Sequence, residues 1–320
     1  MPWNIKQDII DSTDFRTRCV LRKCSKTLRS QVNDSNAFIP QVKFQLDDNI
    51  VKLTISEKDG VEIVVDYRSE AYGCSVNGKF LFGENHIDRS VADFAAMIRH
   101  PRTHIRTVRG EDTDWFELDE RRTRDKIALV GAFEREFSSC SLRTSGLQFD
   151  LLRLSQQNQM RMLALTRPGI LEFIALRPCE DDQDTSEIIA SEPWKKAKYV
   201  QMTWFLQLPV QSLVRFPWFT VVTIDITLED AKVFVEKIFE FGESFVGWII
   251  NQCLFEVDVF DYFLSEFAHQ GIHLNEGTFH TFLKKMPGTR YHLKIEMIIK
   301  KSGVDLVFSK VLSAEVDQSD

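Results

Sequence analysis

The side chains best suited to catalysis lie in two short stretches, and neither completes a catalytic pattern. Residues 242–247 resemble the nucleophile turn of hydrolases, in which a serine stands between two glycines, but one residue too many separates Ser244 from Gly247. The stretch fits better a turn that ends a helix and leads into a strand. Gly78 and Lys79 lack the preceding glycine of a phosphate-binding loop. We therefore expect no catalytic residues and a protein that is not an enzyme.

The histidines and acidic residues that could bind a metal ion do not form a complete set of ligands. His269 and His273 would share one face of a helix, with Glu276 and His280 nearby, but a glycine interrupts the pair and no His-Glu-x-x-His pattern is present. Residues 180–184 are acidic but lack the ligand spacing of a calcium loop, and a solvated loop fits them better. The sequence predicts no metal site and no cofactor.

The composition that surrounds these residues is that of an ordinary globular chain. Of 320 residues, 43% are hydrophobic and 27% charged, and the net charge is −7. A general nucleic-acid binder would need a basic footprint, which is missing. No apolar run approaches the ~20 residues of a membrane-spanning helix, and the first ten residues lack the pattern of a secretory signal. We expect a cytoplasmic or nuclear protein, or both, without nucleic-acid or membrane partners.

The cysteines predict reduced thiols. None of the six forms a Cys-x-x-Cys pair. In a chain of this length without a signal peptide, buried thiols are expected far more often than disulfides. The positions are Cys19, Cys24, Cys74, Cys140, Cys179 and Cys253.

The first forty residues differ in charge and pattern from the rest of the chain. They carry seven basic and four acidic residues, a net +3 that leaves −10 for the remainder. Apolar residues four apart predict short helices, with Asp14 and Ser25 as caps of the second and third. Three helices this short bury too little apolar surface to be comfortably stable alone. They form either a lid on the main domain or a module that binds a partner.

This segment resembles an F-box of the kind found in the nematode family of F-box proteins that carry an FTH domain. The resemblance is carried by residues 2–5, 9–10, 14–19, 21–26 and 28–29. It implies docking on a Skp-type adaptor, and thereby membership of a cullin-based ubiquitin ligase. The apolar residues implied to bind the adaptor are Pro2, Ile5, Ile9, Leu21 and Leu28.

From Val42 to Phe82 the apolar residues alternate with a period of two. Residues 51–56 and 61–66 read as strands, and Asn77-Gly78 is a strong hairpin signal. The pattern predicts an antiparallel meander with one solvated face. Helices are predicted next, one from Ser90 to His100 and one whose buried face includes Ile127, Val130 and Phe133.

A coarse repeat is predicted in the second half of the chain. Strand-like apolar runs cover residues 171–176, 199–204, 219–226 and 245–250, with helical or turn segments such as 186–198 and 228–241 between them. The second of these segments begins with the capping-box-like pattern Thr227-x-x-Asp230. Strand–helix units of this length predict a leucine-rich-repeat-like array of adjacent parallel strands in chain order. An ordinary α/β sheet with right-handed crossovers is the alternative. Alternation over residues 293–299 and 304–308 predicts a terminal hairpin.

Residues 188–189, 194–198, 219–226 and 228–231 resemble the FTH domain, most specifically in the sequence Trp-Lys-Lys-Ala-Lys. The fold class predicted is α+β: a three-helix F-box, an antiparallel meander, and a leucine-rich-repeat-like α/β array closed by a C-terminal hairpin. The predicted domains are a helical module over residues 1–39, an FTH-like recognition domain over 40–315, and a frayed tail over 316–320.

The resemblance implies a substrate receptor that links an unknown protein target to a Skp–cullin–F-box ligase. The alternative is a binding or scaffold protein whose degenerate F-box no longer engages the ligase, suggested by Met1, Thr13 and Thr27. Aromatic residues crowd one segment, where core packing is expected more than surface anchoring. They are Trp204, Phe205, Phe216, Trp218 and Phe219.

Overall fold

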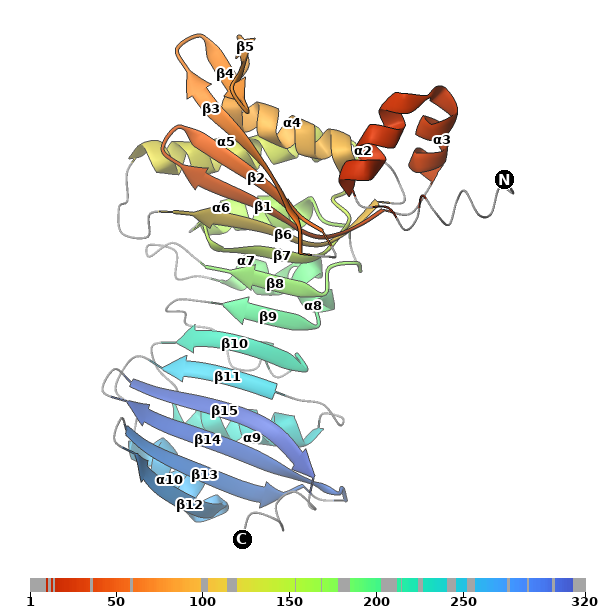
Figure 1. Ribbon diagram of the computed structural model, residues 1–320. Helices are drawn as coiled ribbons and strands as arrows, with labels where there is room; N and C mark the ends of the chain where they lie inside the picture. Colours follow the sequence, from red (N-terminus) through yellow and green to blue (C-terminus); the bar gives the residue numbers. More distant parts are fainter. Residues whose placement is uncertain are drawn as a thin grey trace. The chain divides into compact units, whose positions relative to one another are not determined.

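A computed structural model gives the arrangement of helices and strands along the chain (Figure 1). The chain divides into two units, Met1–Glu172 (unit 1) and Phe173–Asp320 (unit 2). The predicted domain boundaries at residues 39 and 315 stay predictions. The structure describes residues 10, 13, 15–34, 37–57, 60–98, 103–113, 120–152, 154–167, 169–177, 185–202, 212–213, 215–223, 227–240, 246–251, 257–274, 277–286, 288–300 and 303–312.

The sheet of unit 1 has a parallel and an antiparallel part. Its strands lie in the order β7-β6-β1-β2-β3-β4-β5. Strand β6 pairs in parallel with β1 and β7, whereas β1 to β5 pair antiparallel in succession. The predicted antiparallel meander is therefore confirmed. The strands are β1 (Ala37–Asp47), β2 (Ile50–Ser56), β3 (Glu62–Glu70), β4 (Gly73–Val76), β5 (Lys79–Phe82), β6 (Thr103–Asp112) and β7 (Thr144–Leu151).

The local signals of the meander hold at the level of single residues. Val51, Leu53 and Ile55 of β2 are all buried. Asn77 and Gly78 both have positive φ angles, of 48° and 82°, as the tight turn between β4 and β5 requires.

Helices α4 (His86–Ile98), α5 (Glu120–Phe137) and α6 (Gln156–Ala164) cover one face of the unit 1 sheet (Figure 1). Helices α2 (Phe15–Cys24) and α3 (Lys26–Asp34) pack on each other. Two details differ from prediction. Helix α4 starts four residues before Ser90, because Asn85 caps it by accepting bonds from the N–H groups of Ile87 and Asp88. Ile127 is 46% exposed, since Leu129, Val130 and Phe133 form the buried face of α5.

Aromatic rings join these helices to the sheet. Phe44 of β1 contacts Phe94 of α4 and Phe133 of α5 at ring distances of 5.3 and 5.1 Å. Phe137 stacks on Phe133 at 5.8 Å. All four rings are buried, so they form the centre of the unit 1 core.

Unit 2 contains the predicted series of parallel strands. Strands β8, β9, β10 and β11 are neighbours in chain order, and each pair is parallel. The predicted order and direction of the four apolar runs are thus confirmed, while the leucine-rich-repeat-like character of the array stays a prediction. The strands are β8 (Phe173–Leu176), β9 (Tyr199–Met202), β10 (Trp218–Thr223) and β11 (Val246–Asn251).

Four antiparallel strands extend the unit 2 sheet from β11, in the order β15-β14-β13-β12. They are β12 (Ala268–Leu274), β13 (Gly277–Lys285), β14 (Tyr291–Lys300) and β15 (Gly303–Leu312). The predicted terminal hairpin is confirmed, but it does not form the edge of the sheet. His269 and His273 lie on strand β12 and not on a helix. Four residues of a strand span about 13 Å, so the two side chains are too far apart to bind one metal ion.

The helices of unit 2 are shorter and carry clear start signals. They are α7 (Ser186–Ala190), α8 (Glu192–Lys196), α9 (Leu228–Glu240) and α10 (Val257–Glu266). The helical or turn segment predicted over residues 186–198 consists of the two short helices α7 and α8, because Ser191 caps a new helix and Pro193 stands in its first turn. The predicted capping box of α9 is confirmed, with Thr227 Oγ1 accepting from the Asp230 N–H at 3.1 Å.

Candidate functional site

Helices α2 and α3 lie within residues 1–39, the segment predicted to be a three-helix module that binds an adaptor. Helix α3 starts where predicted, because Ser25 Oγ accepts a hydrogen bond from the Leu28 N–H at 3.1 Å. Ile10 and Val32 are buried. Thr13 N–H and Oγ1 both donate to the Ile10 carbonyl, at 3.1 and 2.7 Å. This polar residue thus closes the turn after Ile10.

The predicted adaptor-binding residues fall into two groups. Leu21 and Leu28 are both half-buried, so part of each side chain reaches solvent. Pro2, Ile5 and Ile9 lie outside the described residues. A further apolar residue of α2, Val20, is 55% exposed, although no pattern in the sequence singles it out. The module therefore presents apolar surface that its own described core does not use.

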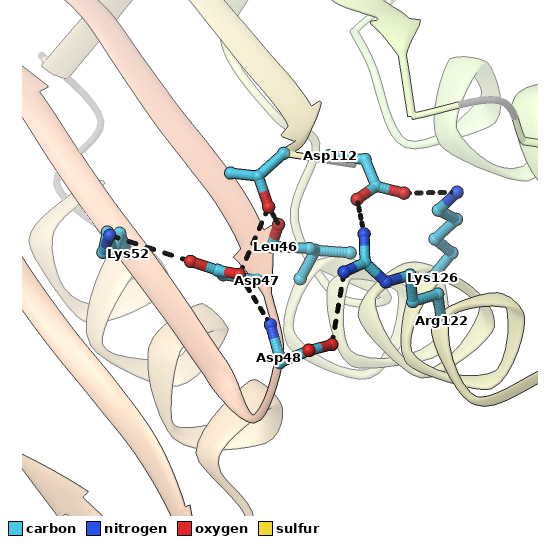
Figure 2. Close-up of polar contacts among 8 residues, drawn as sticks. Leu46, Asp47, Asp48, Lys52, Asp112, Arg122 and Lys126 are labelled. Atoms are coloured by element: carbon cyan, nitrogen blue, oxygen red, sulfur yellow. Dashed lines mark hydrogen bonds and ion pairs between the residues drawn. The ribbon is translucent and has the colours of Figure 1, made fainter. Parts of the chain in front are cut away.

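A buried ion network lies at the carboxyl end of β6 (Figure 2). The Asp112 side chain is 6% exposed and accepts from Arg122 Nη1 at 3.0 Å and from Lys126 Nζ at 2.7 Å. Arg122 and Lys126 stand four residues apart on α5, so they share one face of that helix. Arg122 Nη2 also reaches Asp48, in the β1–β2 turn, at 3.2 Å. The network joins β6, α5 and the β1–β2 turn.

The surroundings of this network are also polar but more exposed. Asp47 accepts from the Asp48 N–H at 2.8 Å and pairs with Lys52 at 3.9 Å (Figure 2). Thr113 Oγ1 donates to the carbonyl of Leu46 at 3.3 Å. Each carboxylate here already has a cationic or N–H partner, so the arrangement suits fold stabilisation more than ligand capture.

A second network anchors α4 to β3. Tyr67 of β3 is buried, and its hydroxyl donates to Asp93 of α4 at 3.0 Å. Arg89 Nη2 contacts the other oxygen of Asp93 at 2.8 Å, and Arg89 Nη1 contacts Glu84 at 3.2 Å. Burial, followed by the charge of Asp93 and the hydrogen bond to it, raises the pKa of Tyr67 above its usual range. Tyr67 therefore stays protonated and acts as a hydrogen-bond donor.

One serine–histidine pair has the distance of a nucleophile and its base. His104 Nε2 of β6 lies 2.7 Å from Ser145 Oγ of β7, and the His104 ring stacks on Phe38 at 6.1 Å. Sequence reasoning missed the pair because 41 residues separate the two positions. Among the described residues no carboxylate hydrogen-bonds His104, so the third group of a triad is missing there. The pair is half of a catalytic arrangement.

A cavity of about 460 Å³ lies in unit 1 near the ends of α4 and α5. Its charged lining residues are Glu136, Arg143 and Arg167, and the exposed thiol of Cys140 lies beside them. No histidine occurs among the described lining residues, so the thiol has no imidazole base there. The cavity combines one acidic and two basic side chains, which suits a polar ligand without selecting its charge.

Aromatic side chains are partly exposed on unit 2. Phe173, Tyr199 and Trp218 are register partners on β8, β9 and β10, with Trp218 6.4 Å from Phe173 and 6.3 Å from Tyr199. Tyr199 is 41% exposed, and the other two are half-buried. Phe216 and Phe219 are fully buried, which confirms core packing for them, whereas Trp204 and Phe205 lie outside the described residues. The ladder of three rings can anchor a bound protein.

The described residues hold neither a metal cluster nor a membrane span. Histidines, cysteines and carboxylates do not gather there in a group that could hold a metal ion. None of the helices there combines the length and apolar character needed to cross a membrane.

Comparison with known families matches one part of the chain to a family model. Residues 130–265 match the FTH domain, which confirms that part of the resemblance seen in the sequence. The match begins in α5 and leaves the N-terminal module outside it. No solved structure matches the chain.

A curated relative carries the same family signal. The chain is 21% identical over 240 residues to F-box A protein 224 of Caenorhabditis elegans, a match that covers 72% of this chain. The chain spans 60% of the length of that relative. Together the two matches support a family of the FTH and F-box A type, and they do not show an F-box in the N-terminal segment.

Proposed function

We propose that this protein is a substrate receptor of a Skp–cullin–F-box ubiquitin ligase. Helices α2 and α3 bind a Skp-type adaptor, and the domain C-terminal to them holds a protein target while other subunits transfer ubiquitin. The protein itself has no catalytic step, and it works in the cytoplasm or nucleus without nucleic-acid, membrane or cofactor partners.

The observation that carries the proposal is the apolar surface of the N-terminal module. Val20 is 55% exposed, and Leu21 and Leu28 each keep part of their surface in solvent. Burying a fully exposed apolar side chain contributes about 1.5–3 kcal/mol, and a side chain that is already half-buried contributes correspondingly less. The name of the related F-box A protein supports the same interpretation of this segment.

Leu28→Asp tests the proposal in the full chain. The substitution removes an apolar contact and adds a charge that binding must desolvate. A loss of about 3 kcal/mol weakens binding more than a hundredfold, so we expect capture of a purified Skp-type adaptor to disappear. Ser30→Asp is the matched control, because it adds the same charge at an exposed position of the same helix. It should capture the adaptor normally.

Capture by neither the wild type nor Ser30→Asp would contradict the ligase role, provided that a known F-box protein captures the adaptor in parallel. The scaffold alternative, with a degenerate F-box, would then replace it. Equal capture by Leu28→Asp and the wild type would show that binding does not use this face. Circular dichroism of each variant separates lost contact from lost folding.

A further inference from the structure

Unit 2 contains a stretch of chain with basic and no acidic residues. Between Glu192 and Asp225 the sequence has four basic side chains and no aspartate or glutamate. These basic side chains, called here the basic cluster, are Lys195, Lys196, Lys198 and Arg215. In a chain of net charge −7, such a stretch is a local reversal of sign, and it favours ligands of negative charge.

Arg215 is the unusual member of this cluster. Its side chain is half-buried, and its described contacts are to the Trp194 carbonyl, through Nη2, and to the Phe216 ring, 4.5 Å from the guanidinium carbon. Burial lowers the pKa of Arg215. A guanidinium that is partly shielded from water is ordinarily paired with a carboxylate, and among the described residues Arg215 has none.

Two further donors near Arg215 also lack acceptors among the described residues. They are Nε1 of Trp194, whose side chain is fully buried, and Oγ of Ser212, three residues before Arg215. Nε of Arg215 is also buried and has no acceptor there. Buried donors without acceptors are rare in folded proteins, because each costs free energy. These donors belong to Arg215 itself and to residues that contact it or precede it closely in the chain, so this part of unit 2 has polar groups that the described residues do not satisfy.

The basic cluster lies at the same end of the sheet as the aromatic ladder. Lys198 directly precedes Tyr199 at the start of β9, and Arg215 stands three residues before Trp218, which starts β10. Tyr199 and Trp218 are register partners with rings 6.3 Å apart. Charged anchors and partly exposed rings therefore share one part of unit 2, a combination common at protein-binding surfaces.

We infer that this surface of unit 2 binds an acidic segment of a protein partner, with a carboxylate seated on the Arg215 guanidinium. A planar guanidinium matches a carboxylate through two parallel hydrogen bonds, which a lysine cannot make. Lys195 and Lys196 add positive charge at the rim, where Glu192 offsets it only in part. A peptide is favoured over nucleic acid because one buried anchor beside aromatic rings differs from the extended row of phosphate contacts that nucleic acid needs. The inference deepens the receptor function and rests on it, since it names the chemistry of the target.

The test measures fluorescence anisotropy with the full chain and a labelled peptide of alternating glutamate and glycine, at low ionic strength. The same peptide with glutamine in place of glutamate is the ligand control. We expect the acidic peptide alone to bind, and Arg215→Gln to weaken that binding roughly thirtyfold or more. Lys285→Gln removes the same charge from an exposed site on β13 and should change the affinity little.

Arg215→Lys keeps the charge but removes the planar fork, so it should also weaken binding, by roughly tenfold. Arg215→Lys is also the test variant to use if Arg215→Gln lowers the melting temperature. Absence of binding by the wild type, equal affinity of both Arg215 variants and the wild type, or equal losses in Arg215→Gln and Lys285→Gln would overturn the inference. Tighter, Arg215-dependent binding of a labelled single-stranded oligonucleotide would overturn it in favour of nucleic acid. None of these measurements uses the adaptor, so failure here is distinct from failure of adaptor capture.

Discussion

Replacing Asp112 by asparagine should destabilise unit 1 far more than its small change in size suggests. The substitution keeps the shape of the side chain and removes its charge. Arg122 and Lys126, whose side chains are only 14% and 11% exposed, then lose the carboxylate that both contact. Their positive charges would repel one another across the space that Asp112 fills.

The size of the effect depends on burial. Removing one partner of a fully buried ion pair costs about 3–5 kcal/mol, because the remaining charge is left uncompensated. The two cations here keep some access to water, so we expect a loss of about 2–4 kcal/mol in the free energy of unfolding. Asp48→Asn is the matched control. It removes a carboxylate that contacts the same arginine but is 68% exposed, so its loss should stay below about 1 kcal/mol.

Urea unfolding followed by circular dichroism measures both variants. If the two units unfold separately, urea produces two transitions, and Asp112→Asn should shift only one of them. Adding Lys126→Met to Asp112→Asn should cost less than the sum of the single losses, since the double variant leaves one unpaired cation fewer. Equal losses for Asp112→Asn and Asp48→Asn, or strict additivity in the double variant, would refute the reasoning.

Two further predictions concern stability. Because burial and Asp93 raise the pKa of Tyr67 above its usual value, its stabilising contribution is complete below about pH 10 and is lost as the pH rises further, since only the unfolded state then releases the proton. The free energy of unfolding should fall above about pH 10 more steeply in the wild type than in Tyr67→Phe; parallel curves would contradict this. Gly110→Ala should cost about 1–3 kcal/mol, because a Cβ there would stand 2.3 Å from Leu152 Cδ1. In Gly131→Ala on α5 the new Cβ meets nothing closer than 3.5 Å, so this variant should be more stable than the wild type by up to about 1 kcal/mol. Equal shifts in melting temperature for Gly110→Ala and Gly131→Ala would contradict the packing explanation.

The sequence predicts well where structure depends on neighbouring residues. The period of two in residues 51–56, the Asn77-Gly78 turn and the Thr227–Asp230 capping box all act within a few residues, and all are observed. The order of β8 to β11 was also predictable. Parallel neighbours joined by short crossovers follow chain order whenever each strand–helix unit packs on the previous one.

Misreadings arise where two local signals compete. Asn85 and Ser90 are both good helix caps, and only the contacts of α4 decide between them. The prediction of a helical or turn segment over residues 186–198 left its division open, and the start signal at Ser191 and Pro193 divides it into two helices. Strands β12 and β13 were missed because histidine and glycine interrupt their apolar alternation.

The charged sites depend on distance in the fold, which the sequence does not give. Asp112 meets Arg122 and Lys126 only because α5 returns beside the end of β6, so no spacing rule predicts the network (Figure 2). The basic cluster is detectable in the sequence, because no acidic residue lies between Glu192 and Asp225. That signal needs the unpaired donors of Trp194 and Arg215 before it indicates a binding site.

A receptor needs two contacts that work independently, and the two proposals place one in each unit. Leu28 lies in unit 1 and Arg215 in unit 2, so the two test variants form a crossed experiment. If the receptor function is right, Leu28→Asp loses the adaptor and keeps the acidic peptide, while Arg215→Gln loses the peptide and keeps the adaptor. A scaffold with a degenerate F-box would bind peptide in the wild type and in Leu28→Asp alike, and would never capture the adaptor. Loss of both ligands in one variant would instead show that the substitution disturbs the fold, because no single side chain described here contacts both sites.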